Sequence, residues 1–245
     1  MNYFFKSIVL MAALGGSAAS AATTTTFHLG GNDGLSYGSL PSFFDLTQEG
    51  LTARFDARSI EGFTESADGI ITGTTLHTDA HIGRYYGGAG VVNSPRDGSH
   101  TVDGSGWKDF IQISFSQIVT IEAISFGFAD YYDDFRLMLD ANDSGDIGLN
   151  DFTSDPIPVL VNNPYQGFGP NFDTDVFGVG AFGDKTCNLE QTPWGHYYKH
   201  CSRDDSWKHK SVTVSFEPSV VPLPAAGLLL LTALGGLGLA RRRRS

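Results

Sequence analysis

Between residues 22 and 217 apolar side chains alternate with polar ones, which is the pattern of half-buried β-strands. Leu51–Arg58 shows the alternation most clearly, because every second side chain is apolar and the others are Thr, Arg or Asp. Shorter stretches with the same period run over Ile111–Phe115, Ile124–Phe128, Phe135–Leu139 and Val212–Phe216. No comparable stretch carries a helical stripe, so the pattern predicts an all-β domain.

Turn-forming pairs separate these stretches, for example Asp97-Gly98, Asp103-Gly104 and Ser144-Gly145. Many short strands with glycine-rich turns predict a single jelly-roll-like β-sandwich over residues 22–217, a length sufficient for one core. Residues 162–195 are rich in Gly, Asn and Phe with weak periodicity, so we expect a long loop there.

The N-terminus has the order of features of a secretory signal peptide. Lys6 supplies a positive charge, Ile8–Leu14 is an apolar run, and Ala19 and Ala21 are small residues at the positions that signal peptidase reads. We therefore expect a signal peptide over residues 1–21, followed by a linker at Thr23–Thr26. The alternatives are an uncleaved anchor and a buried helix.

The C-terminus has the features of a membrane anchor. Val220–Ala240 contains no charged residue, and its length matches the about 20 residues that cross a bilayer. A transmembrane helix is predicted at about 225–240, and the arginines at 241–244 hold its end on the cytoplasmic side. The body then faces outward. The alternative is a buried terminal helix with a basic tip.

The net charge of the body differs from that of the whole chain, because both ends are basic. The chain has 16 Lys and Arg against 27 Asp and Glu, a formal net charge of −11. Lys6 and Arg241–Arg244 belong to the ends, which leaves 11 basic against 27 acidic residues and a body charge of −16. Such a surface repels nucleic acid and anionic lipid and attracts cations.

Cys187 and Cys201 are the two cysteines of the chain. In an exported protein this pair predicts a disulfide, and closing a loop of this size contributes about 3 kcal/mol. His196 and His200 lie between them, so zinc is the alternative. The ligand order is unusual for zinc and the compartment is oxidising, which favours the disulfide.

An acidic segment after Leu139 matches the spacing of a calcium-binding loop, with glycine at the sixth position, Gly145, where the loop turns sharply. Asp146, at the seventh, would donate its backbone carbonyl. The twelfth position is Asp rather than Glu, and a strand precedes the loop instead of a helix, so an acidic turn is the alternative. The candidate ligands of Ca²⁺ are Asp140, Asn142, Ser144, Asp146 and Asp151.

Other chemistry-bearing residues favour structural roles. A cluster of polar side chains could converge on a metal or a sugar, but side-chain-to-backbone capping is favoured; it contains Asp97, His100, Asp103 and Asp109. His77 and His81 lack the glutamate of a zinc protease motif. Aromatic side chains that would stack on sugars if exposed are Trp107, Trp194, Trp207, Tyr197 and Tyr198. No catalytic residues stand out, so no enzyme is predicted.

The C-terminal segment resembles a known sorting signal. Val221-Pro222-Leu223-Pro224-Ala225, an apolar helix and the cluster Arg241, Arg242, Arg243 and Arg244 are similar to the VPLPA variant of PEP-CTERM tails over residues 218–245. The resemblance implies recognition by an exosortase, a membrane-embedded transpeptidase, and loss of the helix. A rhombosortase tail is the near alternative, although its helix begins with Gly-Gly, whereas Gly235-Gly236 lies late here.

Gly88–Leu139 is similar to the β-sandwich bodies of exported PEP-CTERM proteins. The residues that carry this resemblance are Gly90-Val91-Val92, Asp97 to Asp103, Gly106 to Asp109 with the strand after it, Ile118 to Gly127, and Asp133-Asp134-Phe135. The resemblance implies a fold and a location but no substrate.

The expected function follows from the two ends and the body. We expect an exported, non-catalytic bacterial protein of the cell envelope or extracellular matrix, with signal peptidase, exosortase, the membrane and exopolysaccharide as partners. The mature form would lie at the cell surface or in the matrix. The alternative is a secreted carbohydrate-binding module or glycan hydrolase.

Overall fold

The computed structural model describes residues 21–31, 34–61, 64–65, 71–72, 75–77, 79–98, 100–104, 107–130, 133–148, 151–159, 163–169, 172–182, 187–191, 194–195, 197–201 and 205–218. The signal peptide up to Ser20 and the sorting tail from Ser219 onward are sequence predictions that lie outside these residues. Within the described ranges no helix has the length and apolarity that a membrane span requires.

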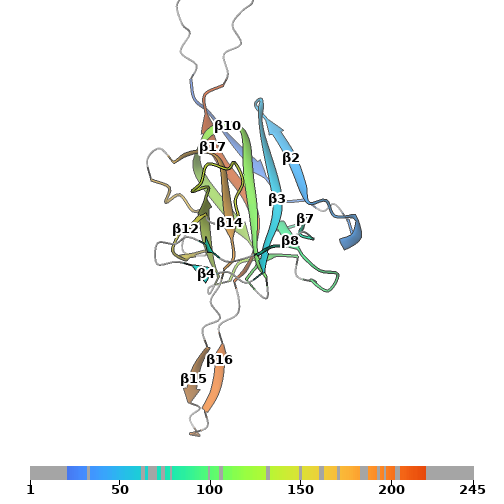
Figure 1. Ribbon diagram of the computed structural model, residues 1–245, viewed down its shortest axis with the longest axis vertical. Coiled ribbons are helices and arrows are strands. Elements are labelled where there is room, and N and C mark those ends of the chain that lie inside the picture. Colours follow the sequence, from blue (N-terminus) through green and yellow to red (C-terminus); the bar gives the residue numbers. More distant parts are fainter. Residues whose placement is uncertain are drawn as a thin grey trace, which may run out of the picture. The chain divides into compact units, whose positions relative to one another are not determined.

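The described residues form strands and one short 3₁₀ turn, Tyr37–Ser39. The strands, many of them labelled in Figure 1, are β1 (Thr23–His28), β2 (Phe43–Gln48), β3 (Leu51–Glu61), β4 (Thr64–Glu65), β5 (Ile71–Thr72), β6 (Thr75–Leu76), β7 (His81–Tyr85), β8 (Gly88–Val92), β9 (Val102–Asp103), β10 (Lys108–Gly127), β11 (Asp134–Leu139), β12 (Phe152–Thr153), β13 (Ile157–Pro158), β14 (Asp173–Gly180), β15 (Cys187–Gln191), β16 (Tyr197–Cys201) and β17 (Ser206–Phe216).

Most of these strands join one antiparallel sheet of 13 strands, whose main path runs β12-β11-β14-β10-β17-β8-β7. β15 pairs with β16 and β4 pairs with β5 in two separate ribbons. The all-β prediction is therefore confirmed, and the fold is β-sandwich-like.

The long strand β10 organises the sheet. On one edge, β3 pairs with Lys108–Phe115 and β17 pairs with Thr120–Gly127, while β14 follows the opposite edge. The register shifts between Ser114 and Val119, where the neighbour on the first edge changes. Such an irregularity bends a strand and increases its twist. β10 thus belongs to two parts of the sheet, which enclose a shared core.

Aromatic and branched side chains fill this core. Phe27, Phe55 and Trp207 are fully buried in one cluster with side chains from β3, β10, β14 and β17. Burying each such side chain contributes about 1.5–3 kcal/mol. The alternation predicted for Leu51–Arg58 is confirmed, because Leu51, Ala53, Phe55 and Ala57 are buried along β3.

The expectation of a linker at Thr23–Thr26 is wrong. These residues belong to β1, which pairs with β17 from Thr23 opposite Phe216 to His28 opposite Ser211. Thr25 and Phe27 point inward and are buried. Threonine has a high strand propensity, and pairing with β17 satisfies the backbone of this segment.

The expectation of a long loop over residues 162–195 is also wrong. β14 lies between β10 and β11 within the sheet, and every residue from Val176 to Gly180 is buried. A strand buried on both faces shows no alternation, which hid it from the sequence pattern. Its glycines make room for neighbours, since a Cβ at Gly180 would lie 2.9 Å from the Cβ of Phe110.

The stretches Ile111–Phe115 and Ile124–Phe128, predicted as separate strands, are two parts of β10, which ends at Gly127. Phe126 is buried, but Phe128 lies beyond the strand with a positive φ of 56° and is 65% exposed. The apolar period therefore predicts the wrong environment for Phe128.

Candidate functional site

The predicted calcium-binding segment forms a loop between β11 and β12, here called the acidic loop (Asp140–Asp151). Asp140 directly follows β11 and Asp151 directly precedes β12. The two strands pair with Leu139 opposite Phe152, so the pairing brings the two ends of the loop together. Residues 149 and 150 lie outside the described residues.

Asp140 folds the first half of the loop around its carboxylate. Its Oδ1 accepts the backbone N–H groups of Asn142 at 3.2 Å and Ser144 at 3.1 Å, and its Oδ2 accepts that of Gly145 at 2.6 Å. Desolvation raises the pKa of Asp140, but these hydrogen bonds outweigh it, and the pKa lies below its ordinary value. The carboxylate therefore stays ionised.

Asp151 closes the second half from a more buried position, with 1% of its surface exposed. Its Oδ1 accepts the N–H of Ala141 at 3.0 Å and the side-chain amide of Asn142 at 3.1 Å, and its Oδ2 accepts the N–H of Gly148 at 2.6 Å. Burial raises the pKa of Asp151, and the negative charges of Asp140 and Asp146 raise it further.

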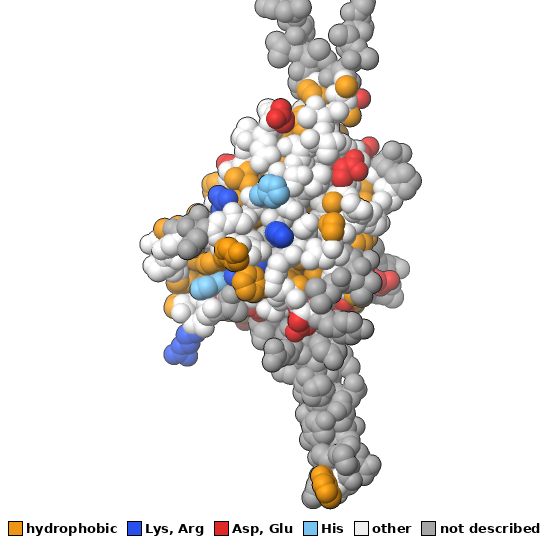
Figure 2. Space-filling view, turned by 180° about the vertical axis from the view of Figure 1, so that it is seen from behind, with side chains coloured by type: hydrophobic (Ala, Val, Ile, Leu, Met, Phe, Trp, Pro, Cys, Tyr) orange, Lys and Arg blue, Asp and Glu red, His pale blue; other side chains and the backbone are white. Residues whose placement is uncertain are grey.

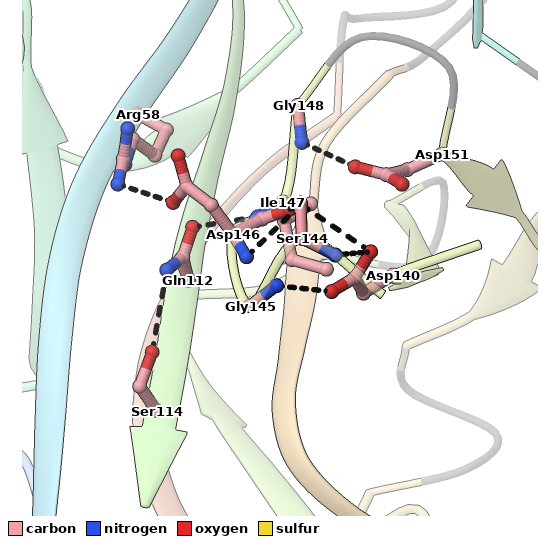
Figure 3. A network of polar contacts seen from close by, with 10 residues as sticks. All are labelled: Arg58, Gln112, Ser114, Asp140, Ser144, Gly145, Asp146, Ile147, Gly148 and Asp151. Atoms are coloured by element: carbon pink, nitrogen blue, oxygen red, sulfur yellow. Dashed lines mark hydrogen bonds and ion pairs between the residues drawn. The ribbon is translucent and has the colours of Figure 1, made fainter. Parts of the chain in front are cut away.

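The loop is attached to the strands beneath it, as Figure 3 shows. The Asp146 carboxylate turns away from Asp140 and pairs with the Arg58 guanidinium of β3 at 2.7 Å. Gln112 of β10 accepts the N–H of Ile147 at 3.0 Å, and the Ile147 side chain is fully buried. This attachment holds the loop backbone in one conformation.

The structure thus brings all five predicted ligands into one loop, and the carbonyl of Asp146 accepts the Ser144 hydroxyl at 2.8 Å. In the described part of the chain, no three or more His, Cys, Asp or Glu side chains are grouped as metal ligands. The carboxylates of Asp140 and Asp151 accept hydrogen bonds from the loop itself. Calcium binding stays a prediction.

The predicted cluster that contains Asp97, His100 and Asp109 has two different roles: Asp97 caps a turn, and Asp109 is a buried acid. The Oδ1 of Asp97 accepts the N–H of His100 at 3.2 Å, which is the capping role favoured from sequence. Asp109 is fully buried and accepts hydrogen bonds from the Ser59 hydroxyl and, at 3.0 Å, from Asn93. Desolvation, followed by the charge of Asp103, raises the pKa of Asp109 well above its usual range.

The cysteines lie on the β15–β16 hairpin, where the backbone register places Cys187 opposite Cys201. Residues directly opposite in an antiparallel pair have Cα atoms about 4.5–5.5 Å apart, which suits a disulfide. The cysteine side chains and His196 are outside what the structure describes, so the disulfide and the zinc alternative both stay predictions.

The candidate sugar-stacking aromatics lie in different environments. Trp207 is fully buried in the core, and its indole N–H donates to the Asp134 carbonyl at 3.1 Å. The rings of Trp107 and His77 are in contact, with centroids 3.6 Å apart. Trp194, between β15 and β16, is 87% exposed. The Tyr197 and Tyr198 side chains lie outside the described residues.

Sequence reasoning missed two surface cavities beside the bulge of β10. One has a volume of about 530 Å³ and is lined by residues that include Ala22, Ile118 and Glu217. The other, of about 340 Å³, shares Ile118 and Asp173 with the first and also has Asp140, Asp143 and Asp175 in its wall. Acidic residues of the acidic loop and of β14 thus line one hollow, a proximity that no local sequence pattern encodes.

Figure 2 shows one face of the body, on which acidic side chains are scattered and a group of hydrophobic side chains lies beside basic and histidine side chains. Comparisons of the chain with protein families, with curated proteins and with solved structures found no match. The site must therefore be interpreted from its own chemistry.

Proposed function

We propose that this protein is a non-catalytic component of the bacterial cell envelope or extracellular matrix. It is made as a precursor with a removable signal peptide over residues 1–21 and a sorting tail over residues 218–245. Signal peptidase and an exosortase process the two ends, and the membrane holds the precursor through the C-terminal helix. The body between them is a jelly-roll-like β-sandwich.

The observation that carries the proposal is the pairing of the first and last strands of the body. Thr23, at the start of β1, lies opposite Phe216, at the end of β17. Ala22–Glu217 forms one compact unit. Cleavage after Ala21 and in the tail would therefore remove no strand of the sheet. This arrangement supports a body that folds outside the cell while both ends are processed.

Two further features support an extracellular role. Asp140 and Asp151 lie at the paired ends of the acidic loop, where Ca²⁺ would reduce the repulsion that adds to burial in raising the pKa of Asp151. The cysteines face each other across a two-stranded ribbon, which alone is marginally stable, so a disulfide would stabilise it. Both suit an oxidising, calcium-containing environment. The body charge of −16 suits a hydrated polysaccharide layer better than nucleic acid.

Intact mass and fractionation of the protein from its native host test this proposal. We expect a mature chain that begins at Ala22, lacks Arg241–Arg244 and leaves the inner membrane. The double variant Pro222→Ala/Pro224→Ala should keep its tail and stay in the membrane fraction. Pro218→Ala, outside the motif, is the matched control and should be processed normally. A mature unmodified protein that retains the complete tail would overturn the sorting proposal.

A further inference from the structure

Two turns meet at a corner of the body and expose two aromatic rings. Tyr86, in the turn between β7 and β8, is 94% exposed, and Phe128, at the end of β10, is 65% exposed. A Cβ at Gly87 would overlap the Phe128 ring, and a Cβ at Gly127 would overlap the carbonyl of Gly87. The absence of side chains at both glycines therefore lets the Phe128 ring lie directly against the β7–β8 turn.

The backbone of Phe128 is strained, and burial of its side chain does not offset that strain. Its φ of 56° lies in the left-handed region, which large side chains avoid and glycine adopts freely. Phe126, two residues earlier, is buried and packs against Trp207 with ring centroids 4.8 Å apart. The Phe128 ring, by contrast, contacts the β7–β8 turn on one side and stays 65% exposed. A strained backbone that presents an apolar ring to solvent is typical of a binding position rather than a core position.

A nearly buried cation, Lys208, lies beside the Phe128 ring and the neighbouring Tyr85 ring. The Lys208 side chain is nearly buried, and its Nζ donates to the carbonyl of His100 at 2.8 Å. That nitrogen lies 4.1 Å from the centroid of the Tyr85 ring and 5.5 Å from that of Phe128. Tyr85 in turn stacks on His100 at 4.9 Å. Cation–π contact and stacking hold the base of the corner rigid.

We propose that Tyr86 and Phe128 form a stacking platform for a neutral hexopyranose unit of a polysaccharide. The apolar C–H face of a pyranose packs on an aromatic ring, and here two exposed rings lie on adjoining turns, where the Phe128 ring reaches Gly87, the residue after Tyr86. This inference goes beyond the proposed envelope function, because it assigns a ligand class and a site.

The small size of the corner and the charge of the body favour a neutral sugar over a protein partner, an anionic lipid or an acidic polysaccharide. A stable protein interface buries about 800 Å² on each partner, far more than two rings supply. The body charge of −16 repels anionic lipid and acidic polysaccharides at long range, and Lys208, the cation beside Phe128, is nearly buried and already donates to the His100 carbonyl. A neutral sugar meets neither obstacle.

Affinity electrophoresis in native gels tests the proposal on the protein purified from its host. The gels contain hydroxyethyl cellulose, laminarin or galactomannan, with alginate as the anionic comparison. We expect retardation of the unmodified protein by at least one neutral polysaccharide, and at least a tenfold loss of affinity in Tyr86→Ala/Phe128→Gly. Ile118→Ala, which removes another exposed apolar side chain, should bind normally.

Three results would overturn the proposal. The first is no retardation of the unmodified protein in any neutral gel, and the second is equal retardation of the double variant. The third is loss of binding to phosphatidylcholine vesicles, but not to polysaccharide, in the double variant, which would make the corner a lipid contact. The double variant should unfold at the melting temperature of the unmodified protein or above it, because Phe128→Gly removes backbone strain, and this result excludes misfolding as the cause of lost binding.

Discussion

Asp140 of the acidic loop and the ionisable side chains at the start of β17 lie in opposite settings. Asp205 and the first residues of β17, together Asp205–His209, are here called the β17 start. In the loop, backbone N–H groups surround Asp140 and hold its pKa below the ordinary value. At the β17 start, burial raises the pKa of Asp205 to about 7 and lowers the pKa of Lys208 to about 8. Asp140 is therefore held ionised, whereas the β17 start favours neutral forms.

The difference follows from how each region satisfies its polar groups. The acidic loop is short of acceptors for its own N–H groups, and carboxylates supply them. The β17 start lies within the sheet, where β9 pairs with Ser206 and Trp207, and its backbone is already bonded. Its side chains bond to backbone groups of other segments, but the loss of hydration outweighs those bonds, so desolvation dominates there.

The largest expected effect concerns His209, whose burial lowers its pKa to about 3. A folded pKa below the unfolded value of about 6.5 means that the unfolded chain binds the proton first. The free energy of unfolding should therefore fall by about 4 kcal/mol as the pH drops from 7 to 3. His209→Leu should remove this acid sensitivity. Urea denaturation at several pH values measures it, and an unchanged acid limb in the variant would contradict the prediction.

Asp205 should act in the opposite direction. Its folded pKa of about 7 exceeds the unfolded value, so the folded protein holds a proton that the unfolded chain has lost. Stability should therefore fall by about 3 kcal/mol as the pH rises from 4 to 7. Asp205→Asn keeps an oxygen for the N–H of Asp134, which Asp205 accepts at 2.9 Å, but cannot titrate.

The His209 and Asp205 contributions oppose each other between pH 4 and 6.5. Relative to the unmodified protein, stability should therefore change downward with rising pH in His209→Leu and upward in Asp205→Asn. The same urea titrations measure both slopes, and parallel profiles for the two variants would show that neither group titrates as its burial requires.

Alternating sequence patterns identify strands that have one face in solvent, and they miss strands whose two faces are both buried. β3 was predicted because Leu51, Phe55 and their neighbours alternate with charged residues. β14 was missed because both of its faces are buried and glycines replace bulky side chains. The β17 start reads as a polar run, and its burial depends on β9 and Asp134, which are distant in sequence.

For the acidic loop, sequence predicted which residues come together but not where they point. The spacing of Asp140 and Asp151 follows from a local loop. The pairing of Asp146 with Arg58 joins positions 88 residues apart, and no local pattern predicts it. The Tyr86–Phe128 corner was missed for a related reason, because the apolar period places Phe128 in the core.

Asp151→Ala tests whether the acidic loop depends on backbone N–H groups that its carboxylates satisfy. The substitution leaves the N–H of Gly148 in a buried setting without its acceptor, and such a loss costs about 1–3 kcal/mol. We expect a loss of about 2 kcal/mol in urea denaturation. Asp155→Ala, an exposed aspartate just beyond the loop, is the control and should change stability by less than about 0.5 kcal/mol. Equal effects of the two would mean that the loop is not organised by Asp151.

The smallest effect compares two residues with positive φ, one in each region. Asp143 of the acidic loop has a φ of 55°, and Phe128, above Lys208 of the β17 start, has a φ of 56°. Aspartate tolerates this conformation, so Asp143→Gly gains little and adds chain entropy to the unfolded state, which should cost about 0.5 kcal/mol. Phe128→Gly removes about 1 kcal/mol of strain and should leave stability unchanged or raise it by about 0.5 kcal/mol. Thermal unfolding at pH 7 resolves the sign. A clear destabilisation by Phe128→Gly would mean that its ring contributes packing, and that the corner is part of the fold rather than a binding surface.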